Sequence, residues 1–157
     1  LMNMILKESP GKKYRIYLLG SKPGIAKLAS AKIKEKYPGI KIEGYHHGYF
    51  SIDDEEKIIK DINYKKPDFL FVGLGAPRQE KWIFENLEHL DVKVCMGIGG
   101  SIDIFAGKVK RAPLIFQKLG LEWFYRLIKE PRRIGRMLAL PHFVLKVLFL
   151  RDKQISS

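Results

Sequence analysis

The chain has 157 residues, of which 46% are hydrophobic and 11% aromatic, enough for one domain with a substantial core. With 14 glycines, 8 prolines and 29% charged residues, the composition argues against a collagen-like or disordered chain. A single cysteine, Cys95, excludes an intramolecular disulfide framework and a multi-cysteine zinc site, and it fits a reducing compartment. The longest apolar stretch, 138–150, falls short of the roughly 20 residues that a spanning helix needs.

The net charge of +12 is unevenly distributed along the chain. From Lys108 to the end, twelve Lys and Arg stand against three acids, a net of +9, which leaves +3 for the first 107 residues. This asymmetry favours an anionic partner for the C-terminal third, such as nucleic acid, a membrane surface or phosphates. A solvated basic face is the plainer alternative.

The predicted elements alternate between strand and helix. Residues 1–7, which open with Leu1 rather than Met, are typical of the end of an amphipathic helix, so we expect the chain to begin inside a longer protein. Strands are predicted at 14–19, 40–44, 69–72 and 92–96. Helices are predicted from Ile25 to about 36, from an N-cap at Ser51 to about Ile62, and from Pro77 to about His89.

This order predicts an α/β fold, a Rossmann-like, mostly parallel sheet with helices on both faces. After Gly107 the strand patterns stop, and 113–119, 120–129 and 131–150 are predicted to be helices punctuated by Gly and Pro. We therefore expect a Rossmann-like core over 1–112, followed by a basic helical appendage over 113–157.

Three glycine-bearing loops, 18–24, 72–82 and 96–103, follow the carboxyl ends of predicted strands. Ligands bind at these ends in open α/β sheets, where glycine lets backbone N–H groups approach a phosphate. Gly20, Gly73, Gly75 and Gly100 are the candidate residues. None of the loops matches a P-loop or a dinucleotide fingerprint, and a tight turn remains the alternative for each.

Polar residues beside these loops are candidates for ligand contacts. Arg78 and Gln79 are expected to be exposed at the ligand edge, where Arg binds phosphate and Gln reads a sugar hydroxyl, whereas Trp82 is expected in the core. Asp103 stands among apolar neighbours and needs a partner, either a pair of ribose hydroxyls or a helix end. Lys110 and Arg111, just after Lys108, could neutralise a diphosphate.

The 45–50 segment is dense in polar aromatic residues. We expect the adjacent His46 and His47 to point apart, and no carboxylate stands at ligand spacing, so no metal site is predicted. Tyr49 could stack on a base or pack as an ordinary loop tyrosine. Cys95 is expected to be a small buried hydrophobic residue.

The C-terminal third combines bulky apolar residues with regularly spaced cations. Arg126, Arg133 and Arg136 lie at helical spacing with Lys129, which suits an interfacial helix on an anionic membrane. The same arginines could instead close over the sheet edge onto a nucleotide diphosphate. A packed C-terminal pair of helices is the third alternative.

Three motifs resemble one family. These are GLGAPRQEKW at 73–82, GIGGSIDIFAGKVKRAP at 97–113 and GLEWFYRLIKEPRR at 120–133. Together they resemble the WecG/TagA/CpsF glycosyltransferases, most of all the TagA branch, over about Tyr14 to Leu150. The resemblance implies a hexosyltransferase that moves N-acetylmannosamine, with inversion and without a metal or other cofactor, from its UDP donor. The acceptor would be N-acetylglucosaminyl-diphospho-undecaprenol, in teichoic acid linkage-unit synthesis at the cytoplasmic face of a bacterial membrane.

Matching by motif, the resemblance implies that Tyr49 and Asp103 bind the uridine and that Gln79 contacts the sugar or acceptor region as an assisting residue. It places Arg126, Arg133 and Arg136 in an appendage that closes over the site and meets the membrane. The family's proposed general base, an aspartate in an upstream Pro-Asp-Gly, is absent from this sequence, so we expect the chain alone to be inactive or feeble. Which sugar is transferred, and whether the protein forms a homo-oligomer, stay open.

The competing hypothesis is a basic nucleic-acid- or membrane-binding module without catalysis. Nucleic acid is the less favoured partner because the cations lie beside bulky apolar residues, in no recognised nucleic-acid-binding pattern.

Overall fold

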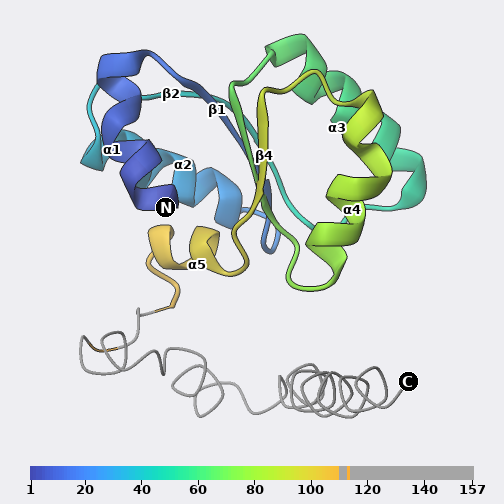
Figure 1. The fold of residues 1–157 in the computed structure, drawn as a ribbon. Helices are drawn as coiled ribbons and strands as arrows, with labels where there is room; N and C mark the ends of the chain where they lie inside the picture. Colours follow the sequence, from blue (N-terminus) through green and yellow to red (C-terminus); the bar gives the residue numbers. More distant parts are fainter. Residues whose placement is uncertain (110–112, 114–157) are drawn as a thin grey trace, which may run out of the picture. The chain divides into compact units, whose positions relative to one another are not determined.

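The computed structural model describes residues 1–109 and 113, and its described fold lies in the first of two units of the chain, Leu1–Lys110. Strands and helices alternate after an N-terminal helix (Figure 1). In chain order they are α1 (Met2–Lys12), β1 (Arg15–Gly20), α2 (Ile25–Lys36), β2 (Lys41–His46), α3 (Ile52–Lys65), β3 (Phe69–Gly73), α4 (Arg78–Asn86), the 3-10 turn η1 (Leu87–His89), β4 (Val94–Gly97) and α5 (Ser101–Phe105).

The four strands form one sheet in the order β2-β1-β3-β4, and every neighbouring pair is parallel. The central strands β1 and β3 run in register from Ile16 opposite Phe69 to Gly20 opposite Gly73. Parallel strands need helical crossovers, which cover both faces and explain why β1 and β3 are nearly continuous apolar runs. The α/β fold with a parallel sheet and interleaved helices is thereby confirmed.

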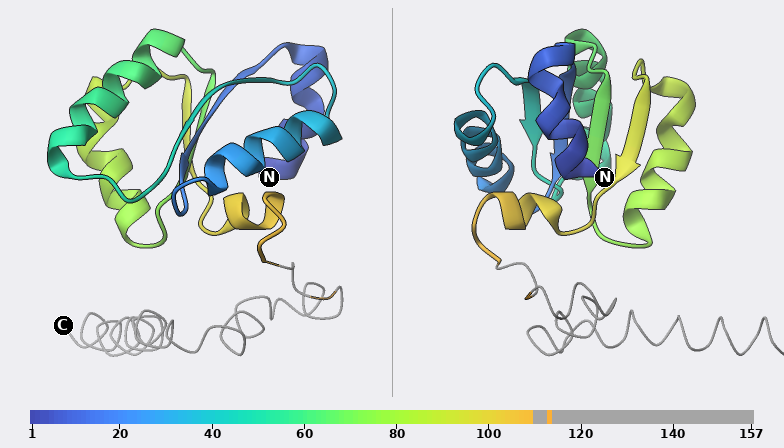
Figure 2. Two further views of the ribbon diagram at one scale, coloured as in Figure 1. Left: turned by 180° about the vertical axis from the view of Figure 1, so that it is seen from behind. Right: turned by 60° about the vertical axis from the view of Figure 1, so that its left-hand side comes forward.

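Side chains of the central strands point alternately to the two faces of the sheet and pack into two separate hydrophobic cores. Ile16, Leu18 and Phe71 point to one face, where α1, α2 and α5 pack. On the other face, Tyr17 and Leu19 pack with buried residues of α3 and α4, including Trp82, whose predicted place in the core is confirmed. Figure 2 shows the two groups of helices on opposite sides of the sheet.

Local sequence signals explain most element ends. The Ser51 Oγ accepts a hydrogen bond from the Asp54 N–H and caps α3, as predicted, and α2 ends at Lys36, directly before Tyr37-Pro38-Gly39. Besides shifts of one to three residues at other ends, the prediction differs at four places. Residues 2–12 form a whole helix, 101–105 form the unpredicted helix α5, β4 begins only at Val94, and the helix after Pro77 ends at Asn86 before the 3-10 turn.

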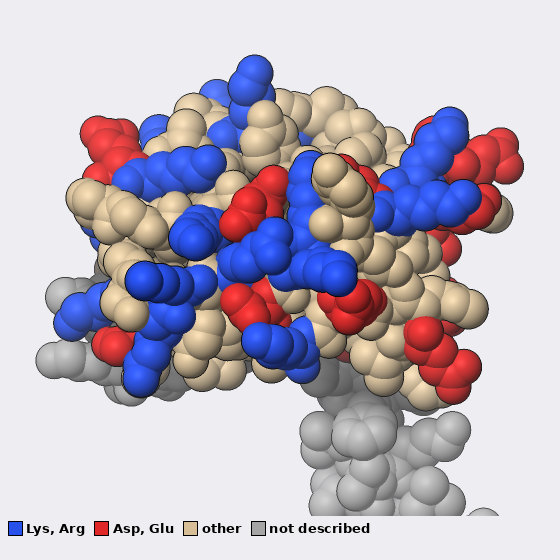
Figure 3. Space-filling view, turned by 90° about the horizontal axis from the view of Figure 1, so that it is seen from above, with Lys and Arg blue, Asp and Glu red and all other residues tan. Residues whose placement is uncertain are grey.

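Figure 3 looks onto the edge at which the strands begin and shows Lys and Arg side chains gathered there, with Asp and Glu among them. Lys12 and Lys65 occupy the last turns of α1 and α3, where cations offset the negative end of the helix dipole. Carboxylates also pair with several of these cations: Arg15 with Glu43, Lys65 with Asp61 and Lys93 with Asp68. Helix ends and ion pairs therefore account for much of the positive charge of this edge.

None of the helices in the described part of the chain combines the length and apolarity needed to cross a membrane.

Candidate functional site

The crossover connections change direction between β1 and β3. A ligand-binding crevice is therefore expected at the carboxyl ends of these two strands. From β1 the chain crosses to β2 on one side, and from β2 it returns past β1 to β3 on the other. Connections that leave in opposite directions open a crevice at such a switch point. The loops after β1, β3 and β4 all lie at this edge, toward the bottom of Figure 1.

Ser21, the first residue after β1, joins the segments that meet at the crevice. Its N–H donates to the Gly73 carbonyl at 3.1 Å, and its carbonyl accepts from the Gly48 N–H at 2.8 Å. Its Oγ donates to the Asp103 Oδ1 at 2.7 Å. Ser21 also has a left-handed backbone, with φ 62°. Nothing in the sequence beyond its place after Gly20 marks this residue, and sequence reasoning missed it.

The glycines of this edge allow backbone segments to touch. A Cβ built on Gly20 would lie 2.7 Å from the Gly73 Cα, and one on Gly73 would lie 2.8 Å from the Gly99 carbonyl oxygen. Their first role is therefore close packing of the three strand ends. The N–H groups of Gly48 and Gly99 already donate within the protein, to Ser21 and Gln79.

Gln79 is buried, so the expectation that it is exposed beside Arg78 is wrong. Its side chain is only 7% exposed, and its Oε1 accepts from the Gly99 N–H at 3.0 Å while its Nε2 donates to Glu80 at 2.7 Å. The amide packs over Gly97, where an added Cβ would lie 2.8 Å from Nε2. Gln79 therefore braces the glycine loop after β4. The signal available in the sequence was the spacing of one helical turn from Gln79 to the buried Trp82 and the half-buried Ile83.

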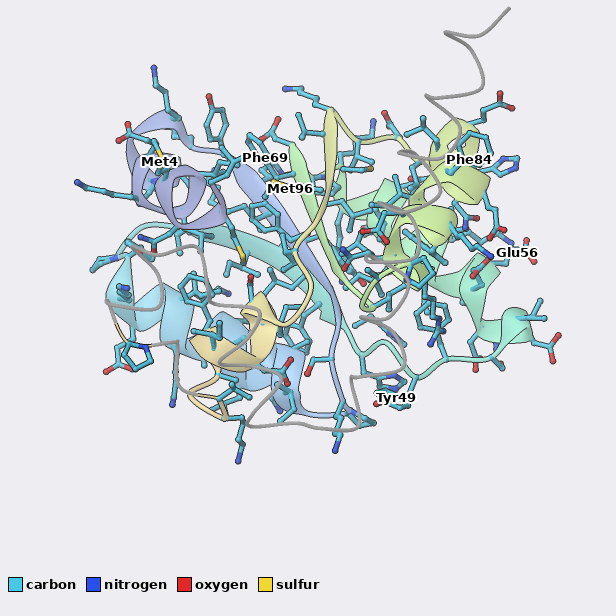
Figure 4. All side chains as sticks on the ribbon, turned by 60° about the horizontal axis from the view of Figure 1, so that its bottom comes forward. Met4, Tyr49, Glu56, Phe69, Phe84 and Met96 are labelled. Atoms are coloured by element: carbon cyan, nitrogen blue, oxygen red, sulfur yellow. The ribbon has the colours of Figure 1, made fainter. Side chains whose placement is uncertain are left out.

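Tyr49 lies at the margin of the carboxyl edge (Figure 4), on the loop between β2 and α3, and is 65% exposed. The same loop brings the rings of His46 and His47 to 4.4 Å between centroids, so the expectation that they point apart is wrong. The expectation assumed that side chains alternate as in a β-strand, but β2 ends at His46. There the His46 Nδ1 lies 2.9 Å from the His47 carbonyl oxygen. Tyr49 thus presents an open ring at the entrance to the crevice.

Asp103 sits in the first turn of α5, half-buried, with Ser21 as its partner. The side-chain partner within the protein is thus a serine hydroxyl rather than a helix end, and the contact with ribose hydroxyls stays a prediction. Hydrogen bonds connect Tyr49's neighbour Gly48 through Ser21 to Asp103, and Gly73 links the same loop to Gly99 and Gln79. Among the described residues, Tyr49, Gln79 and Asp103 therefore share one edge but make no side-chain hydrogen bond with one another.

A groove of about 320 Å³ lies beside the start of α4, lined by Glu55, Pro77, Arg78, Lys81, Trp82 and Glu85. The Arg78 guanidinium is exposed, as predicted, and lies 5.4 Å from the centre of the Phe50 ring. The Trp82 Nε1 donates to Glu55 at 2.7 Å, which fixes the wall of the groove. Arg78 is therefore available to an anion approaching from the crevice.

Titratable groups behind the site have structural partners. The buried Tyr17 hydroxyl donates to Asp61 at 2.8 Å, and burial together with that carboxylate raises the pKa of Tyr17. Burial acts to raise the pKa of Asp61, but hydrogen bonds from Lys65 and Tyr17 outweigh it and lower the pKa. Cys95 is half-buried against the α3/α4 core, and burial raises the pKa of its thiol.

Five candidate residues, Lys110, Arg111, Arg126, Arg133 and Arg136, lie outside the described residues. Within residues 1–109 and 113, no cluster of His, Cys, Asp and Glu could hold a metal ion.

Comparison with known proteins identifies the family. Residues 1–156 match the model of the glycosyl transferase WecG/TagA/CpsF family. The chain belongs to this family. The resemblance drawn from the three motifs is confirmed, and the match extends beyond their range to nearly the whole chain.

Relatives from Staphylococcus aureus, each named N-acetylglucosaminyldiphosphoundecaprenol N-acetyl-beta-D-mannosaminyltransferase, are similar to this WecG/TagA/CpsF member. The protein of strain MRSA252 is 41% identical over 153 residues, and those of strains MW2 and NCTC 8325 are 40% identical over the same length. The alignments cover 98% of this chain and 59% of each relative. The chain thus spans about three-fifths of the length of these relatives.

Proposed function

We propose that this chain carries the nucleotide-sugar-binding part of a hexosyltransferase that moves N-acetylmannosamine from a UDP donor to N-acetylglucosaminyl-diphospho-undecaprenol. The family and the names of the S. aureus relatives support this reaction. The observation that carries the proposal for this chain is the convergence of Ser21, Gly73, Gly99 and Asp103 at the switch point of a parallel sheet. In this proposal residues 1–112 form a Rossmann-like core.

The donor occupies the crevice with its uridine toward Tyr49 and Asp103. An exposed tyrosine offers a stacking face, and a carboxylate accepts hydrogen bonds from ribose hydroxyls or a ring N–H. Gly20, Gly73, Gly75 and Gly100 line the path of the diphosphate, and the exposed Arg78 offers charge to it. In this proposal Gln79 holds the loop that carries Gly99 and assists at the sugar or acceptor region, as the family resemblance implies.

The acceptor hydroxyl oxygen attacks the anomeric carbon of the donor sugar, and the bond from that carbon to the UDP oxygen breaks with its electron pair leaving on UDP. The hydroxyl proton must pass to a base. Among the described residues, Asp103, Glu55 and Asp61 each accept a hydrogen bond within the protein, from Ser21, Trp82 and Tyr17, and the sequence contains no Pro-Asp-Gly, whose aspartate is the family's proposed base. We therefore expect residues 1–157 alone to transfer sugar feebly while still binding UDP.

The basic residues Lys110, Arg111, Arg126, Arg133 and Arg136 serve, in this proposal, the diphosphate groups or an anionic lipid surface through an appendage over 113–157. Because the acceptor is anchored in lipid, the reaction takes place at a membrane surface, on the cytoplasmic side. The net +9 from Lys108 to the end of the chain supports this arrangement. A steep salt dependence of binding to duplex or single-stranded DNA would favour the nucleic-acid alternative instead.

Calorimetric titration of residues 1–157 with UDP tests the proposal, using Tyr49→Ala against Tyr64→Ala as a matched pair. Both tyrosines are exposed, at 65% and 86%, so neither substitution should alter stability. Loss of a stacking ring at Tyr49 should weaken UDP binding by about tenfold, whereas Tyr64→Ala should leave it unchanged. Absence of heat at millimolar UDP, or equal effects of the two substitutions, would contradict the proposed site.

A further inference from the structure

Ser21 has a backbone conformation that L-residues avoid, and it keeps a side chain there. Its φ of 62° lies in the left-handed region, where a serine costs about 1–2 kcal/mol and glycine costs nothing comparable. The preceding residue is already glycine, so the turn itself does not lack flexibility. A serine at this position is favourable when its hydroxyl does something that glycine cannot.

That hydroxyl has one partner in the described structure, the Asp103 carboxylate, at 2.7 Å. The backbone of Ser21 is held on both sides, by the Gly73 carbonyl and the Gly48 N–H, so the position of Oγ is determined by β3 and by the loop that carries Tyr49. Oδ1 of Asp103 accepts the hydrogen bond from the Ser21 hydroxyl, and Oδ2 accepts no side-chain hydrogen bond from residues 1–109. The Ser21 hydroxyl therefore orients the carboxylate through one oxygen, and among residues 1–109 no side chain takes the place of a ligand at the other.

We propose that Ser21 is a positioning residue which holds the Asp103 carboxylate to accept a hydrogen bond from a ribose hydroxyl of the bound nucleotide. This inference rests on the proposed function, which already assigns Asp103 to the uridine, and adds the role of Ser21 in orienting that carboxylate. A carboxylate oxygen accepts well from a hydroxyl, and a site built for that contact discriminates strongly against an analogue that lacks the hydroxyl, because the acceptor is then left unpaired. In this proposal Ser21 fixes the orientation of the Asp103 carboxylate and makes no contact of its own with the base or the phosphates of the nucleotide.

Two substitutions separate positioning from simple structural support. Ser21→Ala removes the hydroxyl and keeps a Cβ at φ 62°, whereas Ser21→Gly removes the hydroxyl and relieves the backbone conformation. Ser21→Gly should therefore be at least as stable to urea as Ser21→Ala. If Ser21 merely supported the fold, ligand binding would follow stability. If it positions Asp103, both variants lose the same discrimination regardless of their stability.

The experiment measures the dissociation constants of UDP, 2′-deoxy-UDP and 3′-deoxy-UDP by calorimetry on residues 1–157 and on the Ser21→Ala, Ser21→Gly and Asp103→Asn variants. The unsubstituted chain should bind UDP about tenfold more tightly than at least one deoxy analogue. All three variants should bring that ratio close to one, mainly by weakening UDP.

Three results would overturn the inference. Equal affinity of the unsubstituted chain for UDP and both deoxy analogues excludes ribose readout, and retained discrimination in both Ser21 variants excludes the positioning role. Each of these leaves UDP binding, and so the proposed function, intact. Absence of UDP binding by the unsubstituted chain would overturn the proposed function together with this inference.

Discussion

Replacing Gly20 by alanine should separate the two central strands at the point where the site lies. Gly20 has φ 143° and pairs with Gly73 across the β1/β3 ladder. An alanine Cβ would lie 2.7 Å from the Gly73 Cα and nearer still to the Gly73 carbonyl group. These atoms belong to a backbone that is itself fixed between β1 and β4, so no flexible side chain can move aside.

The expected loss of stability has two parts. Holding alanine in a conformation that only glycine adopts readily costs about 1–3 kcal/mol. Ordinary carbon contacts lie at about 3.5–4.0 Å, so the strand ends must move apart by about 1 Å. That movement breaks the hydrogen bond of 3.1 Å from the Ser21 N–H to the Gly73 carbonyl, worth about 1 kcal/mol. Together these parts mean that Gly20→Ala should lower the free energy of unfolding by about 2–4 kcal/mol.

Two other glycines supply matched controls in urea denaturation followed by far-UV circular dichroism. Gly24 has φ 80° but open space around a built Cβ, so Gly24→Ala should lose only about 1–2 kcal/mol. Gly11 lies inside α1 with open space and no left-handed φ, so Gly11→Ala should gain about 0.5–1 kcal/mol. A Gly20→Ala protein as stable as Gly24→Ala would refute the close approach of β1 and β3.

Three further substitutions test two polar contacts beside the core. The Arg15 N–H and the Lys93 ammonium hold the pKa of Asp68 below the unfolded value of about 3.9, so this carboxylate stabilises the fold above that pH and loses its effect as pH falls through the folded pKa. Asp68→Asn should therefore lower the free energy of unfolding, measured by urea denaturation, by about 1 kcal/mol at pH 7. The gap in stability between the variant and the unsubstituted chain should narrow at acid pH. A gap that stays constant with pH would show that the charge of the carboxylate is not the cause. Trp82→Phe removes the indole donor to Glu55 and should lower the free energy of unfolding by about 1–2 kcal/mol. Glu55→Gln keeps an acceptor and should lower it by less in the same urea measurement. Equal losses of stability for the two variants would contradict the hydrogen bond.

The layout of the fold could be predicted from the sequence because burial leaves a pattern in it. Strands β1 and β3 are buried on both faces and appear as apolar runs, and Ser51 with acids after it marks the start of α3. The short helix α5 left no such mark. With five residues, it is too short for a helical period and follows glycines that also suit a turn.

The contacts of the site were less predictable because they depend on register across the sheet. That Gly20 faces Gly73 follows from the pairing of β1 with β3, and no local pattern states which residues are paired. Gln79 illustrates the same limit, since a polar residue at the start of a helix is usually exposed, and only the position of Gly99 after β4 supplies the N–H that makes its burial favourable.

The absence of side chains at the touching strand ends decides where recognition can occur. Because Gly20 and Gly73 leave no room for a Cβ between β1 and β3, the first side chain available at this point of the crevice is that of Ser21. Its left-handed backbone and its hydrogen bond to Asp103 direct that side chain toward α5. Gln79 of α4 accepts a hydrogen bond from the Gly99 N–H. In the proposed site, Asp103 of α5 and Tyr49 of the β2–α3 loop therefore remain to recognise the nucleoside, and a substitution that moves β1 from β3 should weaken the discrimination between UDP and its deoxy analogues before it unfolds the core.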